Sequence, residues 1–309
     1  MLPSHKLDQQ DQQQSNKQLI GKQFSLTPYL FILPAIIFLG LTSFLPIVQA
    51  IYLSFTSYDF VGEPQFIGWQ NYANLWRDRL FWKTLGNTLI YLIVAVPSLV
   101  VLPLMLAILV NQKFRTIKFF RAVYYLPVMV SVVVAGIAWK WVYAQNGILN
   151  YFLSIMTWQP VKIPWLTDPK TAIFAIISVV IWRGVGYYMV IYLAGLQSIP
   201  QDLYEAAAID GSDGWRQHFD VTVPLMQPYI ILVSVIATIG AMKIFEEVYI
   251  MSQGGPVNST KTIVYYLYDK GFTSLEMGYA SAIGVFLFLI IFMLSILTFK
   301  FINPTQSID

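Results

Sequence analysis

The stretch Glu205–Phe219, EAAAIDGSDGWRQHF, is a polar segment of helical character that lies between two long apolar runs. Its Glu-Ala-Ala-Ala sequence has high helix propensity, and Gly211 suits the left-handed position that ends a helix. Pro200 fits a first helical position, where its missing N–H costs no hydrogen bond, and Ser212 could cap a second short helix. The segment therefore predicts a folded helix–turn–helix, and the flanking runs decide where it lies.

The composition indicates a membrane protein. Hydrophobic residues make up 57% of the 309 residues and charged residues only 11%, whereas a soluble domain carries about 25% charged residues. The net charge of +3 is too small and too scattered to indicate nucleic-acid binding. The chain has no cysteine, which excludes disulfide and thiol chemistry. Its two histidines, His5 and His218, lie far apart in sequence, so no zinc site is expected.

Six apolar runs are long enough to cross a bilayer, which takes about 20 mostly apolar residues. Backbone groups in lipid must be hydrogen-bonded within the protein, so these runs must be helices. We predict an all-α polytopic membrane protein with one transmembrane domain, residues 29–302. The expected spans cover about 29–55, 85–110, 120–143, 171–196, 224–250 and 277–300, with Pro97 and Pro103 bending the second and Arg183 interrupting the fourth.

The two ends of the chain are polar. A signal peptide would place a short apolar core close behind its charges, but the first apolar run is far longer than such a core. We therefore expect residues 1–28 to be a disordered cytosolic leader, the first run to be a retained span, and residues 303–309 to be a cytosolic tail.

The orientation follows from the short loop after the second span. Its sequence NQKFRTIKFFR carries four basic residues, and short loops rich in Lys and Arg face the cytoplasm. With six spans, both termini and the Glu205–Phe219 segment then face the cytoplasm as well. The outer connections hold tryptophans that suit the membrane–water interface, namely Trp76, Trp82, Trp158 and Trp165.

The polar segment could be a docking element for another protein. Its first helix offers small apolar residues with acidic points at their edge, namely Leu203, Ala206, Ala207, Ile209, Glu205 and Asp210. The alternative is an amphipathic connection that rests on lipid headgroups. Such a connection prefers a basic polar face, and this segment is acidic with one arginine, Arg216. The charge favours a protein partner.

A resemblance to a known protein family indicates which kind of protein partner this segment would bind. The motif EAAAIDG, followed by Pro224 in TVPLMQP, resembles the EAA loop of ABC importer permeases. Other stretches resemble the sugar-permease branch, which includes the maltose-, glycerol-phosphate- and lactose-type permeases: GWQNYANLW with FWKTLGNTL, FFRAVYYLP, WRGVGYYMVIYLAGLQSIPQDLYEAA, MSQGGP and GYASA. The resemblance runs roughly from Pro28 to the C-terminus. Val223 and Ser212 are mild departures, where the family often has Leu and Ala.

The resemblance implies a type I ABC importer permease fold in a bacterial inner membrane, without a catalytic site. The cytosolic coupling loop, residues 197–223, would dock into an ATPase subunit through Leu203, Glu205, Ala206, Ala207, Asp210 and Gly211. Because the chain has no GxxxxGK[ST] motif, ATP and Mg would bind the partner, and this chain would hold no cofactor. The implied partners are a second permease, two copies of the ATPase, an extracytoplasmic solute-binding protein and membrane lipid, with no nucleic acid.

Charges inside spans are costly and usually mark a pathway or an ion pair. Arg183 lies in the fourth span, and Lys243, Glu246 and Glu247 lie near the outer end of the fifth, so the four could meet in the outer leaflet. Two interpretations stay open. The charges form a salt-bridge cluster that closes an outer gate, or they belong to a sugar site together with nearby aromatic rings such as Tyr187.

The resemblance also implies positions for the substrate path. They fall near Tyr124, Val128, Val180, Arg183, Gly184, Tyr187, Ala241 and Ile244. Several are apolar here, so the neighbours Lys243, Phe245 and Glu246 are added. The Gly- and Pro-rich stretch SQGGPVNSTKT predicts a mobile outer loop, which with Gly62–Asn74 is a candidate contact for the binding protein.

The implied activity is import of a carbohydrate or sugar derivative by alternating access. An oligosaccharide, glycerol phosphate and a glycoside osmolyte such as glucosylglycerol all stay open as the solute. An ion-coupled secondary transporter is the alternative, and it would need an ion site among the spans and no ATPase lever. A membrane enzyme would need a catalytic cluster at a membrane face, and none is evident in the sequence.

Overall fold

The computed structural model describes residues 27–112 and 115–302, with side chains described for 29–112 and 115–300. Contacts within the chain divide it into two units, Met1–Gln49 and Ala50–Asp309. The predicted tail, residues 303–309, lies outside the described residues. So does the predicted leader, except for residues 27 and 28, and so does Lys113 of the basic loop.

The first unit holds most of one apolar helical run. This run comprises α2 (Thr27–Leu39), the π-helical turn η1 (Gly40–Phe44) and α3 (Leu45–Ser54), whose last residues belong to the second unit. The stretch Tyr29–Ser54 is long and apolar enough to cross a membrane. It carries no charged residue, which is typical of a helix surrounded by lipid or by other apolar helices.

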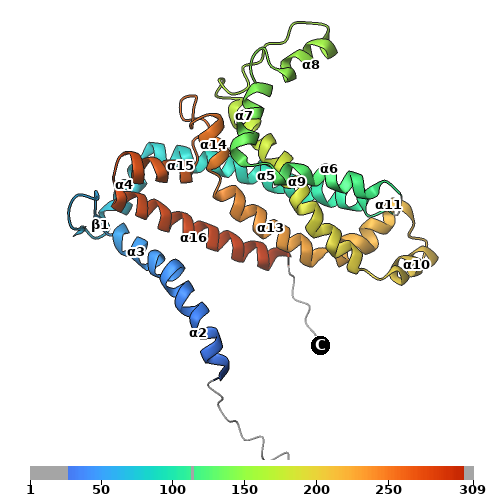
Figure 1. The fold of residues 1–309 in the computed structure, drawn as a ribbon, viewed down its shortest axis with the longest axis horizontal. Coiled ribbons are helices and arrows are strands. Elements are labelled where there is room, and N and C mark those ends of the chain that lie inside the picture. Colours follow the sequence, from blue (N-terminus) through green and yellow to red (C-terminus); the bar gives the residue numbers. More distant parts are fainter. Residues whose placement is uncertain (1–26, 113–114, 303–309) are drawn as a thin grey trace, which may run out of the picture. The chain divides into compact units, whose positions relative to one another are not determined.

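Four long helices form the second unit's core. They are α5 (Arg79–Val110), α9 (Ala172–Ser198), α13 (Gln227–Met242) and α16 (Met277–Ile302). Helix α5 packs against α9 and α13, and α13 packs against α16 (Figure 1). Close approach depends on glycine at two places on α9. A Cβ at Gly195 would lie 2.6 Å from the Tyr229 ring of α13, and one at Gly186 would lie 2.2 Å from the Tyr124 carbonyl.

The third and fifth predicted spans are broken helices. Helices α6 (Ile117–Met129) and α7 (Val132–Val142) meet at 98°, because Val130 and Ser131 leave the helical conformation. The segment Gly214–Leu225 meets α13 at 70°. Among the described residues, four helices could each cross a membrane, or up to six if each bent pair counts as one span. Pro97 and Pro103, predicted to bend or loosen the second span, both lie inside one continuous helix, α5.

Short elements occupy the two ends of the long helices (Figure 1). The fifth predicted span, 224–250, stops being helical at Met242, and a new helix begins at Glu246. At one end of the long helices lie β1 (Thr56–Ser57), antiparallel to β2 (Gln65–Phe66), with α4 (Gln70–Arg77), α15 (Ile263–Tyr268) and the π-turn η3 (Asp269–Thr273). Helix α14 (Glu246–Met251) lies against α7 and α9. At the other end lie α10 (Gln201–Ile209), α11 (Gly214–Gln217), the π-turn η2 (His218–Thr222) and α12 (Val223–Leu225), while α8 (Ile148–Thr157) follows α7.

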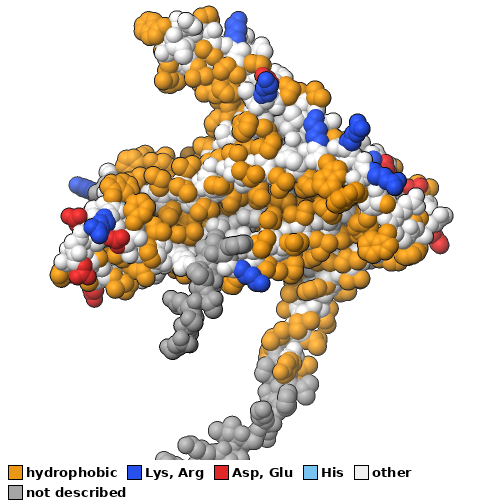
Figure 2. Space-filling view, turned by 180° about the vertical axis from the view of Figure 1, so that it is seen from behind, with side chains coloured by type: hydrophobic (Ala, Val, Ile, Leu, Met, Phe, Trp, Pro, Cys, Tyr) orange, Lys and Arg blue, Asp and Glu red, His pale blue; other side chains and the backbone are white. Residues whose placement is uncertain are grey.

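On the face of the second unit that Figure 2 shows, hydrophobic and charged side chains occupy different regions. Hydrophobic side chains cover the broad middle of the long helices, whereas Lys, Arg, Asp and Glu gather toward their two ends and along the arm that ends in α8 (Figure 2). An apolar middle between charged ends is the pattern that a bilayer requires, because the hydrocarbon core offers no partners for polar side chains.

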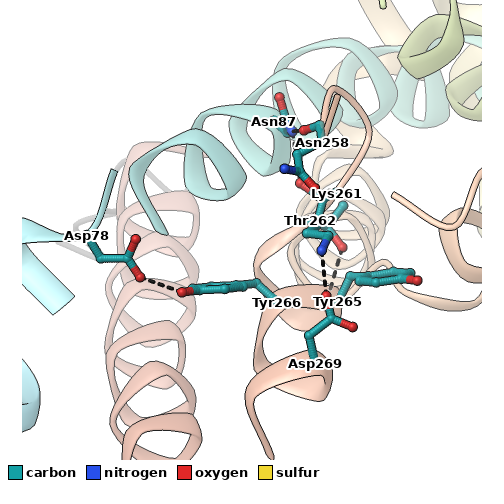
Figure 3. A network of polar contacts seen from close by, with 8 residues as sticks. All are labelled: Asp78, Asn87, Asn258, Lys261, Thr262, Tyr265, Tyr266 and Asp269. Carbon is teal, nitrogen blue, oxygen red and sulfur yellow. Dashed lines mark hydrogen bonds and ion pairs between the residues drawn. The ribbon is translucent and has the colours of Figure 1, made fainter. Parts of the chain in front are cut away.

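The end that holds α15 is fastened by a polar network (Figure 3). Asn87 of α5 donates from Nδ2 to the carbonyls of Asn258 and Lys261, both at 2.9 Å, and Lys83 donates to the Val257 carbonyl at 2.6 Å. The stretch predicted to be a mobile loop is therefore tied to α5 by three side-chain hydrogen bonds. Lys261 also forms an ion pair with Asp269 at 2.5 Å.

Asp78 is the hub of the same network. Its Oδ1 accepts the amides of Leu80 and Phe81 and so caps α5. Its Oδ2 accepts the hydroxyls of Tyr266 at 2.5 Å and Tyr279 at 2.8 Å. Burial alone would raise the pKa of the carboxyl, but the two tyrosine hydroxyls and two backbone amides outweigh burial and hold that pKa below its usual value. One carboxylate thus joins the beginnings of α5 and α16 to α15.

We expect Asp78→Ala to lower the free energy of unfolding by about 2–3 kcal/mol, because it removes a helix cap and leaves two tyrosine hydroxyls without their acceptor. The measurement is thermal unfolding of the purified protein in detergent. Asp59→Ala is the control, since Asp59 is exposed and accepts hydrogen bonds only from the nearby Val61 and Gly62 amides.

The pH dependence of this difference has a defined sign. A carboxyl whose pKa is lowered in the folded protein stabilises the fold above its unfolded pKa, here 3.8, and loses that contribution as the pH falls below it. The advantage of the wild type over Asp78→Ala should therefore be full at neutral pH and shrink below pH 3.8. An advantage that grows as the pH falls would contradict this account of Asp78.

Candidate functional site

A cavity of about 330 Å³ lies among the long helices of the second unit. Helix α5 contributes Tyr91, Ala95 and Leu99, which recur every four residues and so share one helix face. Helix α9 contributes Val180, Gly184 and Tyr188 at the same spacing, and α13 contributes Ala237, Gly240 and Ala241. The non-helical break after α13 and the start of α14, residues 243–247, complete the wall.

Small side chains create this hollow. Five of the residues just named are Ala or Gly, so the three helices approach one another without filling the space between them. The fit is close at Gly184, where a Cβ would lie 2.6 Å from the Leu99 side chain of α5. A larger residue at that position would push α5 and α9 apart or fill the cavity.

The four charges singled out in the sequence divide into two groups. Arg183 of α9 donates from Nη1 to Oε1 of Glu247 at 2.8 Å, and the two side chains are only 21% and 13% exposed. This ion pair joins α9 to α14. Lys243 and Glu246 line the cavity and form no ion pair with any residue that the structure describes. One pair therefore holds two helices together, and the other two charges face the cavity.

Most of the predicted substrate-path residues line this cavity. They are Val180, Gly184, Ala241, Lys243, Ile244, Phe245 and Glu246. Tyr124, Val128, Arg183 and Tyr187 do not line it. The Tyr124 carbonyl packs over Gly186, and the Tyr187 ring packs edge-on against Tyr188 with centroids 5.2 Å apart.

Sequence reasoning missed the contribution of α5 altogether. Tyr91, Ala95 and Leu99 lie in a long apolar run in which every face carries hydrophobic residues, so periodicity alone does not single out one face. The signal that was available is the tyrosine itself, because a hydroxyl in the middle of an apolar span needs a partner.

An aromatic cluster adjoins the cavity through Phe245. Its ring lies 5.4 Å from Tyr249, 5.7 Å from Tyr265 and 5.1 Å from Tyr268, measured between centroids. The Lys261 ammonium lies 5.3 Å from the centroid of Tyr265, within range of a cation–π contact. These rings come from α14, α15 and the break before α14, so they fix that break against the end of the bundle.

The predicted coupling segment lies at the other end of α9. Helix α10 ends in a Schellman turn, in which the Ser212 amide donates to the Ala207 carbonyl at 2.9 Å and the Gly211 amide to Ala208 at 3.1 Å. Gly211 has φ +82°, and a Cβ there would meet nothing within 4 Å. The position thus needs glycine for its backbone conformation and not for space.

Side chains brace this turn. The Ser212 hydroxyl donates to Asp220 at 2.7 Å instead of capping α11, whose preceding residue Asp213 makes no side-chain cap. The prediction that Ser212 caps the second helix was therefore wrong, because Asp220 competes for its hydroxyl. Gln217 donates to the Tyr204 carbonyl at 2.6 Å. The two short helices are thereby joined into one hairpin.

The outward surface of α10 is available to a partner. Leu203 is 44% exposed and Ile209 is 87% exposed, and Glu205, Ala206 and Asp210 are exposed as well. Ala207 is half-buried. Glu205 accepts one hydrogen bond, from Gln201 one turn earlier at 3.2 Å. The helix presents a small apolar surface beside acidic groups, as the sequence indicated.

The Arg183–Glu247 pair allows a direct stability test. We expect Glu247→Gln to lower the free energy of unfolding by about 1–3 kcal/mol, because it leaves the mostly buried Arg183 charge without a counter-charge. The double variant Arg183→Met/Glu247→Leu should recover most of this loss. Thermal unfolding in detergent is the measurement, with Lys243→Met/Glu246→Gln as the control pair. A double variant as unstable as the two single losses combined would contradict the coupling.

Comparison with known proteins now identifies the family. The model of the family described as "Binding-protein-dependent transport system inner membrane component" matches residues 77–306. The lactose transport system permease protein LacF of Rhizobium radiobacter is 34% identical over 292 residues, which cover 92% of this chain and 97% of LacF. The arabinooligosaccharides transport system permease protein AraP of Bacillus subtilis is 34% identical over 279 residues, covering 88% and 87% of the two chains.

The fold matches a solved structure as well. A chain of a bacterial ABC transporter involved in the import of the acidic polysaccharide alginate superposes with a TM-score of 0.78 at 23% identity, over 92% of this chain and 98% of that one. The predicted all-α membrane-protein fold is confirmed. Permeases of this kind are not themselves enzymes, as predicted. The chain belongs to the family of inner-membrane permease components of binding-protein-dependent ABC transport systems.

Proposed function

We propose that this chain is the permease subunit of an ABC importer that moves a carbohydrate or sugar derivative across the inner membrane by alternating access. One observation carries the proposal. Helix α9 lines the cavity with Val180, Gly184 and Tyr188, and the same helix leads at Ser198 into the exposed helix α10. Helix α9 thus connects the proposed solute cavity, through the two-residue link Ile199–Pro200, to the surface that would contact the ATPase.

The cavity supplies the chemistry that a carbohydrate needs. Its volume of about 330 Å³ is at the lower end of the range for small-molecule sites. It combines apolar walls with the charged side chains Lys243 and Glu246 and the ring of Phe245. The names of LacF and AraP, which refer to lactose and to arabino-oligosaccharides, support the same solute class. A second permease would complete the site from the open side.

The hairpin formed by α10 and α11, residues 201–217, is the proposed docking site for the ATPase subunit. A cleft of the partner would close on six residues of the turn, namely Leu203, Glu205, Ala206, Ala207, Asp210 and Gly211. The Schellman turn and the Ser212–Asp220 bond make the hairpin rigid, so a displacement of α10 passes to α9 and to the start of α13 instead of being absorbed locally. ATP and Mg would bind the ATPase, present in two copies.

The proposed orientation places α10 and both termini in the cytoplasm. The basic loop after α5 supports it, since its first residues, Asn111 and Gln112, line one pocket with Tyr204 of α10. The opposite end, with the fastened 252–262 stretch, would then meet the solute-binding protein. An ion-coupled mechanism is not favoured, because it leaves the exposed α10 hairpin without a role.

Substitution of Glu205 tests the docking surface. We expect Glu205→Arg to abolish solute-stimulated ATP hydrolysis and uptake by the assembled transporter, because it places a bulky positive group where a cleft must close. Membrane insertion should be unchanged, as measured by the amount of protein in the membrane fraction. Asp59→Arg is the control, since Asp59 is an exposed acid between β1 and β2, at the end of the bundle opposite α10. Normal uptake by Glu205→Arg would rule out docking through α10.

The solute class is tested on the proposed binding protein. Titration calorimetry with lactose, arabino-oligosaccharides, glycerol 3-phosphate and glucosylglycerol should give saturable binding for at least one, whereas an amino acid such as glutamine should give none. Binding of glutamine and of no carbohydrate would replace the carbohydrate assignment with another solute class and leave the permease assignment in place.

A further inference from the structure

Tyr91 of α5 carries a buried hydroxyl that is not paired within the cavity wall. It lies in the middle third of α5, is 0% exposed and lines the cavity. Its hydroxyl has no hydrogen-bond partner among the described residues. A buried hydroxyl without a partner is unfavourable, and nearly all such groups in native proteins are satisfied by protein, water or ligand.

The apolar walls of the cavity provide few hydrogen-bond partners for this hydroxyl. On its own helix face the next residues are Ala95 and Leu99, and α13 faces the cavity with Ala237, Gly240 and Ala241, none of which has a polar side chain. Tyr188 of α9 also lines the cavity, but its hydroxyl does not hydrogen-bond to Tyr91. The backbone carbonyls of these helices are already used within the helices. Whatever satisfies the Tyr91 hydroxyl must therefore come from the charged side of the cavity or from a molecule inside it.

A second unsatisfied donor lies beside the same cavity. The Nε of Arg183 is buried and has no partner among the described residues, although Nη1 of the same side chain holds Glu247. Arg183 directly precedes Gly184, which lines the cavity, and Glu247 lines it as well. Tyr91 thus brings an unpartnered hydroxyl to the cavity itself, and the unpartnered Nε of Arg183 belongs to a side chain outside the wall that holds the lining residue Glu247. A carbohydrate hydroxyl both accepts and donates, so it suits such a place.

The charges around the cavity indicate what kind of carbohydrate fits. Arg183 and Glu247 neutralise one another at 2.8 Å, and the remaining pair, Lys243 and Glu246, has one positive and one negative group. The formal charge of the four is zero. An anionic sugar would gain no net attraction from this set and would be repelled by Glu246 and Glu247, whereas an uncharged sugar needs no counter-charge.

We propose that the Tyr91 hydroxyl contacts the transported solute and hydrogen-bonds to a hydroxyl group of an uncharged carbohydrate in this cavity, which makes α5 a source of specificity. The proposal rests on the proposed function. In the present conformation the hydroxyl is covered, so the contact forms when the wall of the cavity opens around the solute during the transport cycle.

Removal of the hydroxyl alone is the first test, because the chain contains its own matched control. Tyr192 of α9 is also 0% exposed, and its hydroxyl also lacks a partner among the described residues, but it does not line the cavity. Tyr91→Phe and Tyr192→Phe are therefore the same chemical change, one at the cavity and one away from it.

Both variants are assayed in the complete transporter, assembled with its partner subunits in cells, by uptake of radiolabelled lactose, arabinobiose and glucuronate. We expect Tyr91→Phe to lower uptake of the transported neutral sugar about tenfold, mainly through a higher KM, and Tyr192→Phe to stay within twofold of the wild type. Equal uptake by the two variants would overturn the role of Tyr91. Uptake of glucuronate in preference to both neutral sugars would overturn the uncharged class.

A second test needs no transported sugar. Because the natural chain has no cysteine, Tyr91→Cys and Tyr192→Cys each introduce its sole thiol. The probe is a water-soluble cationic methanethiosulfonate, added to the intact transporter while it hydrolyses ATP, with labelling of this chain read by mass spectrometry. We expect the Tyr91→Cys variant to react at least tenfold faster than the Tyr192→Cys variant.

The outcomes separate the two levels of inference. Equal reaction rates would overturn the placement of Tyr91 on the solute path, whatever the solute is. Fast labelling of Tyr91→Cys, combined with a solute-binding protein that binds glutamine and no carbohydrate, would instead contradict the carbohydrate assignment and with it the hydrogen bond to a sugar hydroxyl.

Discussion

The continuity of α9 is the constraint on which the rest of this structure depends. From Ala172 to Ser198 the helix is unbroken, although it carries Arg183 and three glycines. It packs against α5, α6, α13 and α14. Its middle borders the cavity and its end leads directly into α10. If α9 were kinked between these points, motion of the hairpin would be absorbed at the kink, as happens where a helix loses its ladder of hydrogen bonds.

Arg183 does not break α9 because its charge is met from outside the helix. An unpaired charge at this depth would be strongly unfavourable, and Glu247 supplies the counter-charge from α14. A buried ion pair contributes little net stability compared with apolar residues of the same volume. The ion pair instead holds the start of α14 in place against α9 at the edge of the cavity. The sequence left open whether the four charges gate the path or face the solute; the structure pairs Arg183 with Glu247 and places Lys243, Glu246 and Glu247 in the cavity wall.

The sequence predicted those features that depend on local residue types. Apolar run lengths placed α5, α9 and α16 to within a few residues, and the Glu-Ala-Ala-Ala…Gly pattern placed α10 and its turn, because helix propensity and a left-handed glycine are properties of the segment itself. The break at Val130–Ser131 was not predictable in this way. Residues on both sides of it are apolar, so residue types alone do not mark the break; in the structure the Tyr124 carbonyl of α6 lies against Gly186 of α9. The role of Tyr91 was not predictable either, because its place in the cavity wall depends on how α5 packs against α9 and α13.

The end of α13 illustrates why helix breaks and function coincide. Non-helical backbone at membrane depth is tolerated only where protein or a water-filled space satisfies it. Here the break at Lys243–Phe245 frees the Ile244 carbonyl, and the fully buried Thr262 hydroxyl donates to it at 2.8 Å. Thr262 also caps α15, and its neighbour Lys261 is held by Asn87 of α5. Thr262 and Asn87 thus connect the cavity wall to the stretch 252–262. A shift of that stretch would therefore disturb the non-helical break that forms part of the wall.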